Sequence, residues 1–114
     1  MRYYTETIPN DLGAKLEKAG MPIDWVDDSL EEQPIKAYHC ETMYCEIFDW
    51  LMERGIDAEV ALSRIIDVKN EGKKRVYFWT VGSLDNINYE CGENDNMTWH
   101  EAANAAIEKA LTLI

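Results

Sequence analysis

The sequence predicts an α+β fold, a two-layer sandwich in which two amphipathic helices cover one face of a three-stranded antiparallel β-meander, with a short additional N-terminal helix (order α-α-β-β-β-α). Apolar residues recur with a helical period over 43–54 and near the C-terminus, whereas 56–91 shows strand-like alternation broken by turns. A chain of 114 residues has the size of one core, so we expect a single domain over 1–114.

The first expected helix spans residues 10–19. Asn10 can cap its N-terminus, its apolar residues fall on one face, and Gly20 ends it. An acidic linker at 23–35 follows, containing five acidic residues and no basic one. Such a charge run is typical of a solvated segment.

The second expected helix spans residues 43–54. Thr42 can supply a hydroxyl N-cap, and Gly55 stops the helix. Its apolar residues recur at i, i+3, i+4 and i+7, as one buried stripe requires, and they are Tyr44, Ile47, Phe48 and Leu51.

Three strands are expected after this helix. Residues 56–63 alternate between apolar and polar, "KNEG" at 69–72 makes a hairpin turn, and "KRVYFWTVG" at 74–82 returns as a strand rich in β-branched and aromatic residues. Gly82 to Asp85 turns the chain again, and "NINYEC" at 86–91 forms a shorter third strand.

The chain closes on a helix in "NMTWHEAANAAIEKALTLI". Thr98 and Glu101 have the T-x-x-E spacing of a capping box. One helical stripe carries the apolar residues Trp99, Ala103, Ala106, Ile107, Ala110, Leu111 and Ile114. We therefore expect this helix to pack on the sheet.

The charge and composition exclude several classes of function. Twenty-two acidic and eleven basic residues give a net charge of −11, which disfavours direct nucleic-acid binding. The sequence has no run of 18 apolar residues and no signal-peptide h-region, so we expect no membrane association. Three cysteines, an odd number, fit a reducing compartment, so we expect a cytoplasmic protein.

A cluster of His39, Cys40 and Cys45 raises the question of a metal or thiol site. Structural zinc takes four ligands, usually as two close pairs, and only the single residues Cys91 and His100 could complete a set here. Adjacent residues such as His39 and Cys40 rarely act as base and nucleophile, and the sequence has no Gly-rich oxyanion loop. We expect no catalytic residue, metal or cofactor, and hence no enzyme.

The stretch "VYFWTV" is apolar on both faces of its strand. If Val76 and Phe78 meet the helices, then Tyr77 and Trp79 lie on the far face among acidic neighbours, where large aromatics favour protein binding. Alternatively, the N-terminal helix or Trp25 covers them. The candidate partner-binding residues are Tyr77, Trp79, Glu59 and Glu90.

The helix "CEIFDWLMERGI" and the closing "TWHEAANAAIEKALTLI" resemble a group of small proteins of unknown function encoded in bacterial genomes, prophages and other mobile elements. That group carries a T-x-x-E-V-F-D-W-L-like segment, a strand pair and a helix like Y-x-E-A-x-x-A-x-I-x-x-A-L. The resemblance covers residues 8–20 and 42–114 and rests on core and cap positions. It implies the fold and no catalytic residue. Residues 39–41 and the acidic linker have no counterpart.

The sequence thus predicts a non-catalytic accessory or adaptor protein of a bacterial or phage element, a monomer or weak dimer. It would bind an unidentified protein through its aromatic sheet face. The alternative is an acidic mimic of nucleic acid that occupies the basic groove of a DNA- or RNA-binding enzyme. A mimic needs acidic residues in rows spaced like phosphates.

Overall fold

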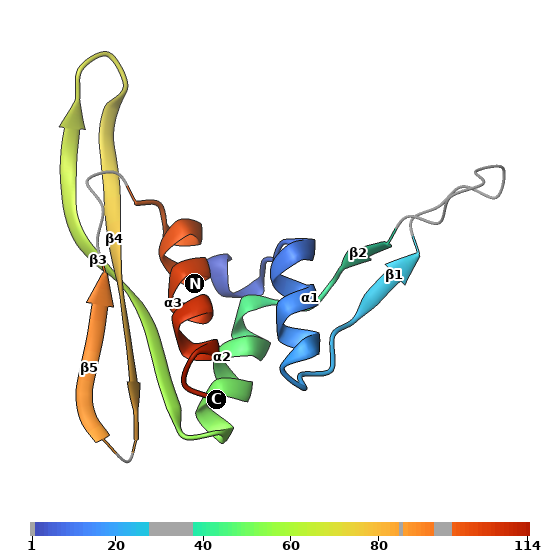
Figure 1. Ribbon diagram of the computed structural model, residues 1–114. Coiled ribbons are helices and arrows are strands. Elements are labelled where there is room, and N and C mark those ends of the chain that lie inside the picture. The colour runs from blue at the N-terminus through green and yellow to red at the C-terminus, as the bar shows by residue number, and fades with distance from the viewer. Residues whose placement is uncertain (1, 28–37, 85, 93–96) are drawn as a thin grey trace, which may run out of the picture. The chain divides into compact units, whose positions relative to one another are not determined.

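The computed structural model describes residues 2–27, 38–84, 86–92 and 97–114. These residues form an α+β fold with three α-helices, a two-stranded antiparallel sheet and a three-stranded antiparallel sheet (Figure 1). None of the described helices has the length and apolar run that crossing a bilayer requires. The chain divides into two compact units, 1–47 and 48–114, and each unit has its own sheet.

The first unit contains a two-stranded ribbon that the sequence did not predict. Its strands pair antiparallel, with Trp25 opposite Cys40 and Val26 opposite His39. The elements of this unit are the 3-10 helix η1 (Arg2–Thr5), α1 (Asn10–Lys18), β1 (Trp25–Asp27) and β2 (Tyr38–Cys40). Because β1 falls within the expected linker at 23–35, the predicted order of elements was wrong there. The rest of that linker lies outside the described residues.

Helix α1 confirms the first predicted helix to within one residue at its C-terminal end. It buries Leu12 and Leu16, and the chain then turns at Gly20, whose φ of +104° suits glycine. Gly13 faces the ribbon, and a methyl group there would lie 3.2 Å from Sγ of Cys40 and 3.3 Å from Cη2 of Trp25. The missing side chain therefore lets α1 pack closely on β1 and β2.

Two N-cap assignments made from the sequence were wrong. Pro9 occupies the N-cap of α1 without a side-chain hydrogen bond. At α2 (Tyr44–Glu53), the backbone N–H of Met43 donates to Oε2 of Glu46 at 2.7 Å, while Oγ1 of Thr42 accepts from the N–H of Asp24 at 2.9 Å. Both side chains that the sequence offered as caps instead bind backbone groups elsewhere in the first unit, Asn10 at β2 and Thr42 at Asp24.

The second unit contains the predicted three-stranded meander, in the order β3-β4-β5. Strand β3 continues to Val68, five residues beyond the predicted end at residue 63, and the turn then follows at Asn70, which has a φ of 71°. The elements are β3 (Ile56–Val68), β4 (Gly72–Ser83), β5 (Asn86–Gly92) and α3 (Trp99–Leu111).

Helix α3 begins with the predicted capping box. Oγ1 of Thr98 accepts from the N–H of Glu101 at 3.2 Å, and the Glu101 carboxylate accepts from the N–H of Thr98 at 3.3 Å. The helix packs on β3 and β4 and buries Trp99, Ala102, Ala103, Ala106, Ile107 and Ala110. Leu111 is only half-buried and Ile114 is exposed, so the predicted stripe ends earlier than expected.

The two faces of the three-stranded sheet follow from its register. Residues directly opposite each other share a face, so Ala58, Val81 and Glu90 lie together. Val81 is 1% exposed, and Oε2 of Glu90 forms an ion pair with Nζ of Lys109 on α3 at 2.6 Å. We call this side the helix face, and its members are Ile56, Ala58, Val60, Leu62, Tyr77, Trp79, Val81 and Glu90. The opposite side, the open face, carries Asp57, Glu59, Ala61, Val76, Phe78, Thr80 and Cys91, and Val76 on it is 0% exposed.

A β-bulge interrupts β3 at Ser63. Leu62 pairs with Tyr77 and Arg64 pairs with Val76, so β3 has one more residue than β4 at this point. Beyond the bulge, β3 and β4 continue as a two-stranded ribbon, because the pairing of β5 with β4 extends only to Trp79 (Figure 1).

Trp79 lies against Gly92, its neighbour across β4 and β5. A methyl group at Gly92 would lie 2.6 Å from Cζ2 of Trp79, well inside van der Waals contact. The indole thus occupies the space that a side chain at Gly92 would need.

We expect Gly92→Ala to destabilise the protein by about 1–3 kcal/mol, because the new methyl group displaces the indole. Urea denaturation measures the loss. In a Trp79→Ala background the same change should cost nothing or stabilise the strand by up to about 1 kcal/mol. Equal effects of Gly92→Ala in the two backgrounds would contradict the contact.

Candidate functional site

The four predicted partner-binding residues do not form one surface. Tyr77 is 8% exposed and Trp79 is half-buried, and both lie on the helix face with Glu90. Glu59 is exposed on the open face, opposite Thr80. The expectation that Tyr77 and Trp79 face away from the helices was therefore wrong. The strand is apolar on both faces, so its alternation did not determine which side α3 covers.

The open face carries one aromatic residue, Phe78, which is half-buried. Its cross-strand neighbour Ala61 is exposed, as are Glu59 and Cys91, while Thr80 is half-buried. Among the described residues this face thus offers a small apolar centre beside a carboxylate and a thiol, a combination that suits a protein contact.

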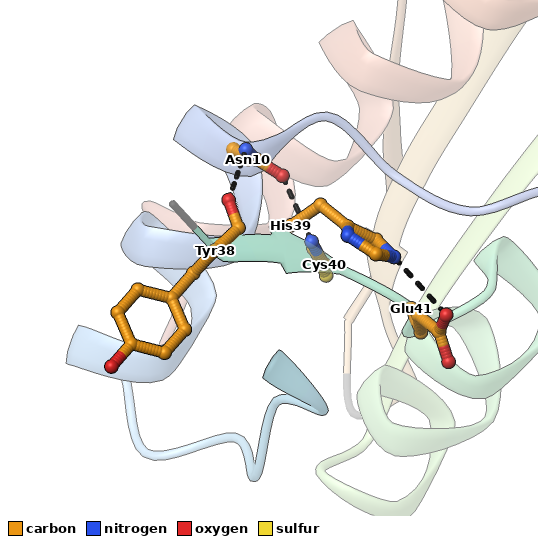
Figure 2. A network of polar contacts seen from close by, with 5 residues as sticks. All are labelled: Asn10, Tyr38, His39, Cys40 and Glu41. Atoms are coloured by element: carbon orange, nitrogen blue, oxygen red, sulfur yellow. Dashed lines mark hydrogen bonds and ion pairs between the residues drawn. The ribbon is translucent and has the colours of Figure 1, made fainter. Parts of the chain in front are cut away.

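The histidine and cysteines that the sequence singled out are dispersed. Cys40 is buried in β2, Cys45 is half-buried in the first turn of α2, and Cys91 is exposed on β5. Nε2 of His39 lies 3.1 Å from Oε1 of Glu41 at the surface (Figure 2). Within the described ranges, no three His, Cys, Asp or Glu side chains come together as a metal site would need.

The Asn10 side chain joins α1 to the edge of β2. Its Nδ2 donates to the carbonyl of Tyr38 at 3.1 Å, and its Oδ1 accepts from the N–H of Cys40 at 2.9 Å (Figure 2). The carboxamide thus supplies one donor and one acceptor to alternate backbone groups, as a neighbouring strand would. The sequence could not reveal this role, because Asn before a helical pattern also suits a cap.

We expect Asn10→Ala to expose the β2 edge and leave the part-buried Cys40 N–H without its acceptor, at a cost of about 1–2 kcal/mol. Hydrogen exchange at the Cys40 amide should accelerate about tenfold. The matched control is Asp11→Ala, because Asp11 is the exposed neighbour on the same helix. An unchanged exchange rate in Asn10→Ala would contradict the bridging role.

Aromatic side chains also line a hollow in the first unit. Trp25 and Tyr38 flank a volume of about 360 Å³, and Nε1 of Trp25 donates to Oε2 of Glu17 at 2.7 Å. The hydrogen bond fixes the indole against α1. Tyr38 is exposed, so the hollow opens to solvent.

Basic residues are concentrated on the ribbon beyond the bulge, residues 64–75, which we call the arm. The arm holds five of the eleven basic residues of the chain and two of its 22 acidic residues. Its charge is therefore +3, and the remaining residues carry 6 bases and 20 acids, a charge of −14. The basic residues are Arg64, Lys69, Lys73, Lys74 and Arg75. Sequence reasoning missed this segregation, although "KKR" in an acidic chain could have indicated it.

The comparisons with known proteins return no relative. No family model, curated protein or solved structure matches the chain.

Proposed function

We propose that this chain is a non-catalytic accessory or adaptor protein that binds another protein through the open face of its three-stranded sheet. The observation that carries the proposal is the composition of that face, where half-buried Phe78 lies beside exposed Ala61 and Glu59. The other side of the sheet packs on α3, and on the open face a partner can add a layer over exposed Glu59, Ala61 and Cys91, next to the end at which Val76 is already buried.

The proposal keeps the aromatic sheet face predicted from the sequence but assigns it to Phe78. An apolar centre with a charged border is the usual anatomy of a protein interface, and a truncated aromatic anchor there costs about 2 kcal/mol of binding or more. We also retain, as proposals, the two-layer arrangement of both amphipathic helices on one sheet face and the kinship with small proteins of bacterial and mobile-element genomes.

The test is affinity capture from host extract with immobilised protein, followed by mass spectrometry and a binding assay with the purified partner. Variants Glu59→Arg and Ala61→Arg change exposed positions on the open face and should each weaken binding at least tenfold. Glu53→Arg makes the same charge change at an exposed position of α2 and should have no effect. A partner that binds all three variants equally would overturn the proposed surface.

The second candidate function is a mimic of nucleic acid. The charge of −14 outside the arm favours it, because a basic nucleic-acid groove attracts such a surface. A mimic should compete with duplex DNA for a cationic nucleic-acid enzyme, and the competition should weaken steeply as salt rises. Capture of a partner whose binding is insensitive to salt would exclude this candidate.

A further inference from the structure

The arm differs from the rest of the protein in charge. Its charge of +3 contrasts with −14 elsewhere. At about 3.3 Å per residue, its strands run about 15–20 Å beyond the bulge, roughly two Debye lengths at physiological salt. The basic residues near the tip therefore act on their own surroundings and are not neutralised by the acidic remainder of the unit.

Two aliphatic side chains lie exposed where the arm begins. Leu62 is 48% exposed and Ile65 is 55% exposed. Ile65 lies directly opposite Arg75, so one face of the arm presents an aliphatic and a basic group side by side, and next to them Asp67 lies opposite Lys73. A partner that binds this face must supply apolar contacts for the aliphatic side chains and acidic groups for the basic ones.

The edge of β4 in the arm has backbone groups directed away from β3. The N–H of Tyr77 donates to the carbonyl of Met97 at 3.0 Å and so points away from β3. Strand backbones alternate every two residues, so Arg75 and Lys73 direct their groups to the same side. No strand in the described part of the chain pairs with β4 there, since β5 stops opposite Trp79. Because the N–H of Tyr77 is already bound by Met97, an extended segment can add at this edge along Lys73 and Arg75.

From these three features we infer that the arm binds an extended protein segment that carries acidic and aliphatic side chains. The segment pairs with the β4 edge and places acidic groups against Lys73, Lys74 and Arg75. Its long aliphatic side chains extend over β4 toward Leu62 and Ile65 on β3, at about twice the 4.8 Å spacing of neighbouring strands. This inference rests on the proposed protein-binding function and adds a second surface with a defined partner chemistry.

A protein segment fits the arm better than a nucleic acid does. Phosphates would leave Leu62 and Ile65 without a partner, whereas the aliphatic side chains of a peptide can contact them. The acidic remainder would also oppose a long polyanion more than a short peptide with few charges.

The test is selection from a display library of random twelve-residue peptides against the full-length immobilised protein. Enriched peptides should be rich in Asp, Glu and aliphatic residues. Fluorescence anisotropy then measures the affinities of synthetic copies of these peptides for the protein. Lys73→Gln/Arg75→Gln should weaken binding about tenfold, and Ile65→Ser about fivefold. Lys15→Gln/Lys18→Gln removes the same number of exposed charges from α1 and should have no effect.

Several results would overturn the inference. The first two are a selection that enriches neutral or basic peptides and a selection that enriches none. The next two are peptide binding to Lys73→Gln/Arg75→Gln, which we call the arm variant, as tight as to the parent protein, and polyglutamate binding as tight as that of the selected peptides. The last is tighter binding of duplex DNA than of the peptides at physiological salt. Peptides that bind the arm variant but not Glu59→Arg would overturn the inference and leave the proposed open-face function intact. Circular dichroism of each variant establishes that it is folded before binding is measured.

Discussion

Replacing Ile107 by aspartate is expected to unfold the second unit. Ile107 is 0% exposed in the middle of α3, where the helix packs on β3 and β4. Aspartate would leave a cavity and bury a carboxylate without a partner, which costs about 3–5 kcal/mol or more. A domain of this size has a total stability of about 5–15 kcal/mol, so little or none would remain.

Circular dichroism melting of the purified variant measures this effect. Leu113→Asp is the matched control, because Leu113 lies just past the end of α3 and is 47% exposed. It should melt within a few degrees of the parent protein. A soluble Ile107→Asp variant with a cooperative melt near that of Leu113→Asp would refute the packing of α3 on the sheet.

The double change Tyr77→Ser/Trp79→Ser is expected to cost about 3 kcal/mol or more of folding stability. Both side chains lie on the helix face, where Tyr77 is buried and Trp79 fills the space over Gly92. Their removal leaves cavities that neighbouring groups cannot fully close. Urea denaturation measures the loss, which would be small if these residues lay on an uncovered face.

Leu62→Ser provides the comparison for the double variant. Leu62 belongs to the helix face by its pairing with Tyr77, yet it is exposed where the arm begins, so its replacement should change stability by less than about 1 kcal/mol. A double variant as stable as Leu62→Ser would restore the original sequence-based placement of Tyr77 and Trp79.

Elements fixed by local patterns could be predicted from the sequence. The closing helix has both halves of its capping box in Thr98 and Glu101, and the structure confirms them. The second helix, predicted over 43–54, spans Tyr44–Glu53, and its buried residues Ile47 and Leu51 keep the helical spacing. Such patterns depend on neighbours within one or two turns, so they can be recognised in the sequence, although contacts with distant residues overrode the caps offered by Asn10 and Thr42.

Features fixed by distant contacts could not be predicted. The ribbon of β1 and β2 depends on Asn10, which lies 28 residues before Tyr38. The side of the sheet that α3 covers depends on packing, since either face of "VYFWTV" is apolar enough. The bulge at Ser63 also breaks the alternation of β3, so residues 64–68 do not read as a continuation of the strand.

The two candidate surfaces, the arm and the open face, could not be predicted from the sequence for a related reason. A net charge of −11 is an average, and it conceals that five basic residues share one hairpin. Composition excludes a function only if charge is spread evenly, and here Lys73, Lys74 and Arg75 follow the turn directly. Phe78 was likewise assigned to the core because its strand neighbours are also large and apolar.

The bulge at Ser63 also interrupts the edge of the sheet. Strand β3 is the edge of its sheet over 13 residues, and a straight edge of that length would be a template on which further copies of the chain could stack. The extra residue shifts the register by one, so a second straight strand can match β3 on one side of Ser63 but not on both. We expect this irregularity to hinder edge-to-edge pairing of β3 with a regular strand.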